Sequence, residues 1–258
     1  MYVAETVHRA TGLPVQRVYF WLDTVALFAF LIVLYGFLRW WASPSQALVA
    51  VLLTILILPL TYALHFFHPW DRLSLLIWVA LLWLLRAERL IAFGALLVVG
   101  MLVKYDLIFL PGLYFLTKLP FREPRVLLTT AGLFLLSIGT YLFIVLAFGS
   151  GLGERQMSAQ VIANLEQIWS MKIWYAPLLG LAIPGALAVL GVPQADRFAR
   201  ACAGFAVLQC VPLFLRSNFA ELRAEMPVVI LLLPAALAGL DRLAAGSGRI
   251  HSSAGSTR

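Results

Sequence analysis

Long apolar runs separated by short polar segments dominate the chain. A helix that crosses a membrane needs about 20 apolar residues, and only helices or closed barrels satisfy their backbone hydrogen bonds in lipid. The strict apolar and polar alternation of barrel strands is absent from the sequence. The apolar runs therefore predict membrane helices near residues 18–38, 46–67 (with Pro59 as a kink), 73–85, 126–148, 174–192, 201–215 and 226–240.

The apolar run over residues 90–117 carries charges in its middle, at Lys104 and Asp106. As one helix it would be about 42 Å long, whereas the hydrocarbon core is about 30 Å thick. Two short helices that meet at Lys104 would bring both charges to a membrane surface. We therefore predict a helical hairpin here, and a steeply tilted single helix is the alternative.

An amphipathic segment covers residues 157–169. Its apolar positions fall on one helical face, and Gln160, Asn164, Glu166 and Gln167 fall on the other, which predicts an interfacial helix lying on the membrane. Residues 246–258 are rich in Ser and Gly and predict a disordered cytoplasmic tail. The predicted fold class is thus all-α: one polytopic membrane domain over residues 1–245, with about eight membrane helices.

Composition supports the membrane class. Of the 258 residues, 62% are hydrophobic and only 12% are charged, whereas a soluble domain carries about 25% charged residues. This excludes a cytosolic enzyme, a secreted disulfide domain and a disordered chain. Because the net charge of +7 sits in short loops, it indicates topology and not a nucleic-acid partner. Cys202 and Cys210 would lie about 12 Å apart on a helix, too far for a disulfide.

The distribution of Lys and Arg predicts the orientation. Counted over alternating loops, eleven of the 19 basic residues fall on one side, including Arg39, Arg86, Lys118 and Arg197. The positive-inside rule places that side in the cytoplasm of a bacterial inner (plasma) membrane, with the N-terminus outside and the C-terminus inside. Two basic residues precede the first span, against this rule, so we expect that one more helix originally lay upstream.

Charges near bilayer depth are candidates for function because they are costly there. Asp71, Lys104 and Asp106 fall at the predicted outer surface. Asp71 could cap the following helix, or its carboxylate could bind a metal ion or a sugar phosphate. Lys104 could form a buried salt bridge with Asp71 or Asp106, or hold a phosphate.

Other polar residues at that surface admit two interpretations each. His65 and His68, with Asp71, could ligate a transition metal, although such a pair is more often structural. Asp23 is expected to be solvated or paired. Glu221 and Arg223 lie in a loop before the final span, too close together to face each other on a helix, so each either reaches a different partner or stays in water.

Three local patterns carry a resemblance to a known family. An outer-loop acid opens a Leu-rich span that ends in basic residues (Asp71 through Arg89); a small-residue helix closes on a Lys and an acid (Gly100 through Pro111); and Glu-x-Arg precedes a Pro-containing final span (Glu221 through Pro234). In this order they resemble the integral-membrane GT-C superfamily of glycosyltransferases, which use polyprenyl-phosphate-linked sugars.

The resemblance implies roles for particular residues. Asp71 would be the second outer-loop acid, Lys104 would contact the donor phosphate, and Glu221 and Arg223 would lie near the substrate groove. We therefore take Asp71 and Glu221 as the candidate catalytic residues. The candidate substrate-binding residues are Lys104, Asp106, Arg72 and Arg223, and Mg²⁺ or Mn²⁺ is the candidate cofactor.

The chain also departs from the family pattern. The family's catalytic acid lies in a first outer loop after an N-terminal helix, and this sequence begins downstream of both. It contains no adjacent pair of acids, and Tyr105 displaces the acid that follows Lys104 by one position. Asp71, Glu221 and Glu225 are the carboxylates left to act as a base.

Three functions are consistent with these features. The first is a GT-C-like scaffold, active, truncated or inactive, that transfers sugar from a lipid-phosphate donor at the outer leaflet. The second is a non-catalytic membrane subunit that packs in a larger complex. The third is a small transporter, suggested by the charges at the helix break. The expected partners are membrane lipids, a lipid-linked sugar and another membrane protein.

Overall fold

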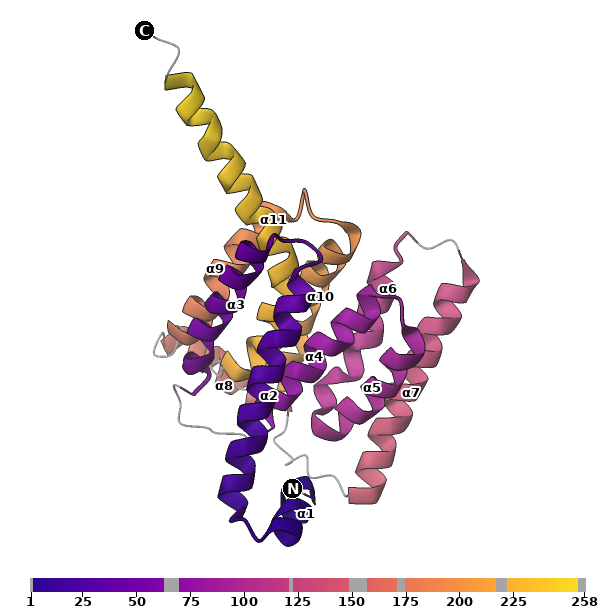
Figure 1. Cartoon of the computed structure of the whole chain (residues 1–258). Helices are drawn as coiled ribbons and strands as arrows, with labels where there is room; N and C mark the ends of the chain where they lie inside the picture. The colour runs from indigo at the N-terminus through magenta and orange to yellow at the C-terminus, as the bar shows by residue number, and fades with distance from the viewer. Residues whose placement is uncertain are drawn as a thin grey trace.

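The computed structural model of the chain describes residues 2–62, 70–120, 123–148, 157–170, 175–216 and 222–254, and all regular structure in these ranges is helical. Figure 1 shows the helices gathered into one bundle from which the C-terminal helix projects. The elements are α1 (Tyr2–Thr11), α2 (Val15–Leu38), α3 (Pro44–Ile57), η1 (Leu58–Tyr62), α4 (Asp71–Arg86), α5 (Leu90–Val103), η2 (Tyr105–Phe109), α6 (Leu110–Thr117), α7 (Pro124–Phe148), α8 (Met157–Ser170), α9 (Tyr175–Gly191), α10 (Arg197–Arg216) and α11 (Leu222–Ala254).

Four helices in the described ranges are long and apolar enough to cross a membrane. They are α2, α7, α10 and α11, and shorter apolar helices cover 44–57, 90–103, 105–117 and 180–191. This confirms the all-helical architecture and the membrane character predicted from the apolar runs. The number of about eight membrane helices stays a prediction.

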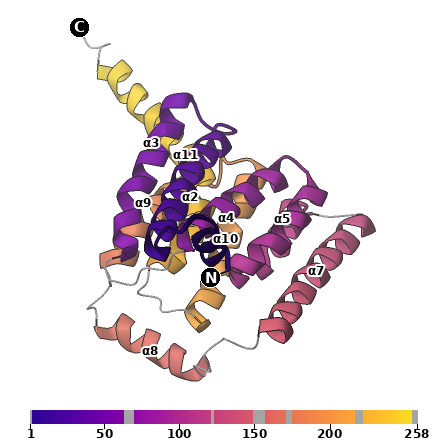
Figure 2. The same cartoon turned by 60° about the horizontal axis from the view of Figure 1, so that its bottom comes forward.

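The centre of the bundle is formed by α4 and α11. Trp78, Leu81 and Leu82 of α4 are fully buried, as are Val229 and Ile230 of α11. α4 packs against α2, α5 and α11, whereas α7 lies at the edge of the bundle (Figures 1 and 2). Only 22% of the most apolar window of α7 is buried, against 56% for α11, so α7 presents most of its surface to the surroundings.

The predicted hairpin is confirmed. The chain descends through α5, breaks at Lys104, and returns through η2 and α6. The ion pair between Lys118 Nζ and Glu88 Oε1, at 2.7 Å, joins the residue after α6 to the turn before α5. The two arms therefore start and finish at the same end of the bundle, and Lys104 lies at the other end.

Two local predictions need correction. Pro59 does not kink a continuous α-helix; α3 ends at Ile57 and continues as the 3₁₀ helix η1, because proline cannot donate the helical hydrogen bond. α11 runs to Ala254, through most of the segment predicted to be a disordered tail from Gly246. On the predicted polar face of α8, Asn164 is buried and donates to the Phe214 carbonyl at 2.6 Å, whereas Glu166 is exposed, and the interfacial position of this helix stays a prediction.

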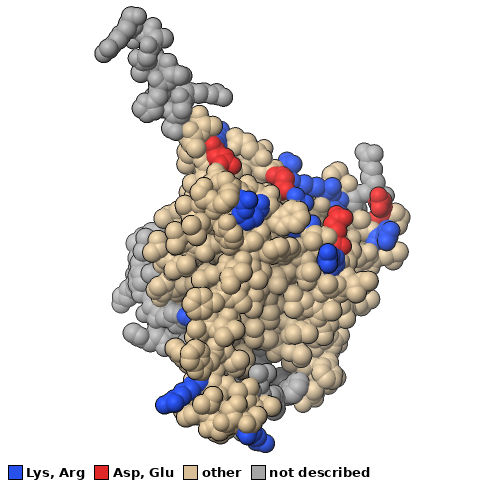
Figure 3. Space-filling model, viewed as in Figure 1, with Lys and Arg blue, Asp and Glu red and all other residues tan. Residues whose placement is uncertain are grey.

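Charged side chains gather at the two ends of the bundle, and the middle of the face in Figure 3 is almost uncharged. Trp21 of α2 and Trp40, in the turn just after α2, are both exposed. From Trp21 to its end at Leu38, α2 rises by about 26 Å at 1.5 Å per residue, which is close to the hydrocarbon thickness. Tryptophans concentrate at membrane interfaces, so the uncharged belt has the dimensions of a membrane-embedded zone.

Candidate functional site

Three charged residues that are separate in the sequence meet at one end of the bundle. Lys104 Nζ lies 3.7 Å from Asp71 Oδ1 and 4.0 Å from Asp106 Oδ2. We call these residues the acidic cluster, since two carboxylates share one ammonium group. Their side chains are 12%, 15% and 30% exposed for Asp71, Asp106 and Lys104, respectively. The expected proximity of Asp71 and Lys104 is confirmed.

Asp71 reaches the acidic cluster as the first residue of α4. The N-cap of this helix is Trp70, and no side-chain hydrogen bond caps it. The prediction that Asp71 caps α4 is therefore wrong. An acid in the first turn still lies at the favourable, positive end of the helix dipole, and here its carboxylate is also turned toward Lys104.

The helix break at Lys104 depends on a close approach at Gly100. Lys104 has extended backbone angles (φ −154°, ψ 120°), so the chain leaves α5 abruptly before η2. A Cβ at position 100 would lie 2.6 Å from Leu107 Cδ1 and 2.7 Å from Ile77 Cγ2. Only a glycine lets η2 fold back this tightly onto α4 and α5, and that fold brings Asp106 beside Lys104.

Polar atoms continue from the acidic cluster along α4. Ser74 and Trp78 follow Asp71 by three and seven residues, so they share its helical face. Ser74 Oγ, Trp78 Nε1 and Asp106 Oδ1 are buried and complete no hydrogen bond to the described part of the chain, although the Trp78 indole does lie close to the Asp106 carboxyl. Buried polar atoms of this kind are expected to have a partner such as water or a ligand.

Arg72, predicted to bind substrate, forms an ion pair with Asp23. Its Nη1 donates to both oxygens of Asp23, at 2.9 and 2.7 Å, and both side chains are about 15% exposed. The paired alternative for Asp23 is thus confirmed. Arg72 serves this two-oxygen contact between α4 and α2.

The remaining predicted residues contribute less. Glu221, His65 and His68 lie outside the described residues, as does the side chain of Arg223. Glu225 of α11 is 2% exposed, and neither of its carboxylate oxygens has a hydrogen-bond partner in the described ranges.

Asp71 and Asp106 are the described residues that could hold a metal ion beside Lys104. No group of three or more His, Cys, Asp or Glu gathers in the described ranges. Mg²⁺ is commonly held by only one or two carboxylates, with water and substrate phosphates completing its shell. The acidic cluster, with a formal charge of −1, has donors suited to such an ion.

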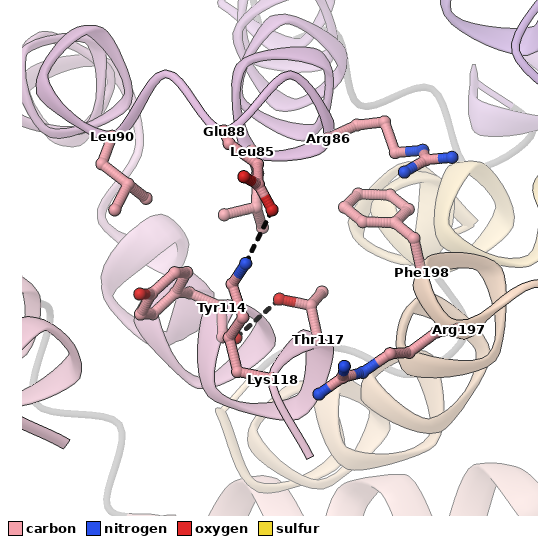
Figure 4. Close-up of a pocket in the computed structure, with 9 residues that line it drawn as sticks. All are labelled: Leu85, Arg86, Glu88, Leu90, Tyr114, Thr117, Lys118, Arg197 and Phe198. Carbon is pink, nitrogen blue, oxygen red and sulfur yellow. Dashed lines mark hydrogen bonds and ion pairs between the residues drawn. The ribbon is translucent and has the colours of Figure 1, made fainter. Parts of the chain in front are cut away.

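A second polar site, which sequence reasoning missed, lies at the opposite end. It is a cavity of about 240 Å³ between the α4–α5 turn, α6 and the start of α10. Its polar lining consists of Arg86, Glu88, Tyr114, Thr117, Lys118 and Arg197 (Figure 4). We call this cavity the basic pocket. In the sequence its cations indicate only membrane topology, and no local motif predicts that they come together.

Two of the cations in the basic pocket have partners. Arg86 Nη2 contacts Asp196 Oδ2 at 3.1 Å, and the guanidinium lies 5.3, 5.6 and 5.7 Å from the rings of Trp40, Trp41 and Phe198. Lys118 pairs with Glu88, and its hydrogen bond and charge lower the pKa of the Glu88 carboxyl.

Comparison with known proteins gives no relative: no protein-family model, curated protein or solved structure matches the chain.

Proposed function

We propose that the chain is a GT-C-like membrane glycosyltransferase scaffold that transfers a sugar from a lipid-phosphate donor at the membrane surface bearing the acidic cluster. The observation that carries this proposal is the meeting of Asp71 and Lys104, within 3.7 Å, at a helix break. The sequence resemblance implies a carboxylate and a phosphate-binding cation at these two positions. A base and a phosphate-binding cation that act on one substrate must lie close together, and Asp71 and Lys104 do so.

The chemistry divides between the two residues. The Asp71 carboxylate accepts the proton of the acceptor hydroxyl as its oxygen bonds to the anomeric carbon of the sugar. The bond from that carbon to the donor phosphate breaks, and its electron pair remains on the phosphate oxygen. Lys104 stabilises the negative charge that this phosphate gains.

The charge of the acidic cluster sets a further condition. Two carboxylates around one ammonium leave an excess negative charge, which disfavours a phosphate. A Mg²⁺ or Mn²⁺ ion held by Asp71 and Asp106 would offset that charge and polarise the phosphate oxygens. We therefore expect donor binding to depend on a divalent cation.

A second function, a non-catalytic subunit of a membrane complex, is favoured by the two outer helices. Only 28% of the apolar window of α2 and 22% of that of α7 are buried. Lipid or another membrane protein covers these faces, and a protein partner would make the chain one part of a larger assembly. Transport is a third candidate, supported only by the charges at the helix break.

The test of transfer uses the full chain in nanodiscs with labelled polyprenyl-phosphate sugars and lipid acceptors. Asp71→Asn should lower transfer by about 100-fold or more, the size of a general-base contribution. The matched control is Asp241→Asn, at the opposite end and bonded there to Gln46, which should transfer at the wild-type rate.

Two results would overturn the proposal. Unchanged transfer by Asp71→Asn would remove the assigned base. A folded wild-type chain that neither transfers sugar nor binds any lipid-phosphate donor, with or without Mg²⁺, would exclude the transferase. Recovery of the chain in a stable complex with another membrane protein would then favour the subunit.

A further inference from the structure

We propose that the basic pocket binds a phosphate group, presented either by an anionic lipid headgroup or by a soluble phosphate. This site lies at the end of the bundle opposite the acidic cluster and is independent of sugar transfer. The proposal rests on the net positive charge of the lining, on Arg197, which has no ion pair within the described residues, and on the Glu88 carboxylate, which lies against Lys118 at a residue with a left-handed backbone.

The lining has more positive than negative charge. Arg86, Lys118 and Arg197 line the cavity together with a single acid, Glu88. Counting Asp196, which pairs with Arg86 just outside the lining, the site retains a formal charge of +1. A cavity with such an excess favours an anion.

Arg197 is the cation available to a ligand. No ion pair joins it to any side chain in the described part of the molecule. In Figure 4 its guanidinium points toward the side of the pocket lined by Lys118 and Thr117, whereas that of Arg86 points away above Phe198. Arginine presents a planar set of N–H donors that fits two oxygens of one phosphate.

The Glu88 carboxylate lies beside Lys118, at the position where a bound phosphate would contact this lysine. Its carboxylate contacts the ammonium at 2.7 Å, yet its side chain is 73% exposed, so water and ions can reach the pair. Exposed pairs of this type contribute only about 0–1 kcal/mol. A phosphate that also contacts Arg197 can therefore compete for Lys118.

The backbone at Glu88 supports a specific role for this carboxylate. Glu88 has a φ of +56°, in the left-handed region where glycine usually ends a helix. The Arg89 N–H donates to the Leu84 carbonyl and the Glu88 N–H to that of Leu85, as expected for such a helix end. Holding a residue other than glycine in this conformation costs free energy. Here it places the Glu88 carboxylate against the Lys118 ammonium group.

The position of the basic pocket suits a ligand at membrane-surface depth. Trp40, at the same end of the bundle, is 49% exposed and lies beside Arg86, and exposed tryptophans mark the interface. Leu85 and Phe198 give the pocket a buried apolar wall. A headgroup phosphate and a phosphate from the aqueous phase could both enter here.

The test measures binding to the full chain in a neutral detergent by native mass spectrometry. One arm titrates phosphatidylglycerol against phosphatidylcholine, whose headgroup has no net charge, and the other titrates inorganic phosphate. Arg197→Gln should weaken binding by about tenfold, the loss of one charge-assisted contact. Arg200→Gln is the matched control, since Arg200 is exposed on the same helix but does not line the pocket.

Glu88→Gln gives a change of opposite sign. Removing the competing carboxylate should strengthen phosphate binding about two- to fivefold. A merely structural role for the Glu88–Lys118 pair would not produce a gain.

Each outcome decides the proposal. Selective loss in Arg197→Gln with phosphatidylglycerol identifies a lipid site, and the same loss with inorganic phosphate alone identifies a soluble ligand. Equal losses in Arg197→Gln and Arg200→Gln would show diffuse surface charge and overturn the proposal. An absence of binding in both arms would overturn it as well.

Discussion

The two ends of the bundle each hold a lysine against a carboxylate, but in opposite settings. Lys104 lies between Asp71 and Asp106, whose side chains are 12% and 15% exposed. Within the described ranges, Lys118 forms its ion pair with Glu88, whose side chain is 73% exposed. The first site has an excess of negative charge inside the protein, and the second has an excess of positive charge open to solvent.

This difference determines what each lysine can do. Removing one partner from a buried ion pair is strongly destabilising, because the other charge stays buried without compensation. An exposed pair contributes little and can be exchanged for another ion. Lys104 is therefore needed for the fold, whereas Lys118 can change partners without unfolding its surroundings.

The largest effect is expected for Lys104→Met. It removes the ammonium group that Asp71 and Asp106 share, and we expect a loss of about 1–3 kcal/mol, below the value for a fully buried pair because Lys104 is partly exposed. Thermal unfolding in detergent, followed by tryptophan fluorescence, measures this loss. Lys118→Met is the comparison and should change stability by less than about 1 kcal/mol.

A second substitution identifies the cause of the Lys104 effect. Adding Asp106→Asn to Lys104→Met removes one of the two neighbouring carboxylate charges and should restore part of the lost stability. Equal stability of the two lysine variants, or no rescue by Asp106→Asn, would contradict the contrast between the ends.

Gly100→Ala should have the next largest effect. Its methyl group would meet Leu107 and the stiff side chain of Ile77, so we expect overpacking to cost about 1–2 kcal/mol. The control is Gly132→Ala, because nothing lies within 4 Å of a Cβ there. Both changes favour the helical backbone equally, so the difference in unfolding temperature isolates the crowding, and equal temperatures would contradict it.

A smaller effect is expected at Glu88. Glu88→Gly and Glu88→Ala both lose the ion pair to Lys118, but only glycine relieves the positive φ. Glu88→Gly should therefore be about 1 kcal/mol more stable than Glu88→Ala. Thermal unfolding of the two variants measures this, and a more stable alanine variant would show that the left-handed conformation is absent.

The smallest effect is a pH dependence at the same turn. Lys118 lowers the pKa of Glu88 below its usual value of 4.5. The pair therefore stabilises the protein above that value, and its contribution disappears as the pH falls through the lowered pKa. Stability measured between pH 7 and pH 3 should fall less in Lys118→Met than in the wild-type chain, and identical profiles would exclude the link.

The helices were largely predictable from the sequence because each follows from a local apolar run. The hairpin at Lys104 was predictable for the same reason, since two charges in a run of that length require a break. The end of α3 at Ile57 was not predicted, because proline permits either a kink or a helix end and the packing around it decides.

The site was only partly predictable. Asp71 and Lys104 could be paired because topology assigned both to one surface. The basic pocket could not be found in this way, because its cations also satisfy the positive-inside rule and converge only when α4, α6 and α10 pack together. The occupation of Arg72 by Asp23 likewise depends on how α2 packs on α4.

We expect the acidic cluster and the basic pocket to face opposite sides of the membrane. One cysteine at a time can be introduced, either at Tyr105 or at Arg200. Tyr105 lies beside Lys104 and is 46% exposed, and Arg200 is exposed near the basic pocket. Each introduced cysteine can be tested in intact cells with a membrane-impermeant maleimide. The wild-type chain is the background control, since its two cysteines lie within α10. We expect Tyr105→Cys to be labelled from outside and Arg200→Cys only after the cells are opened; labelling of both variants from the same side would contradict the account.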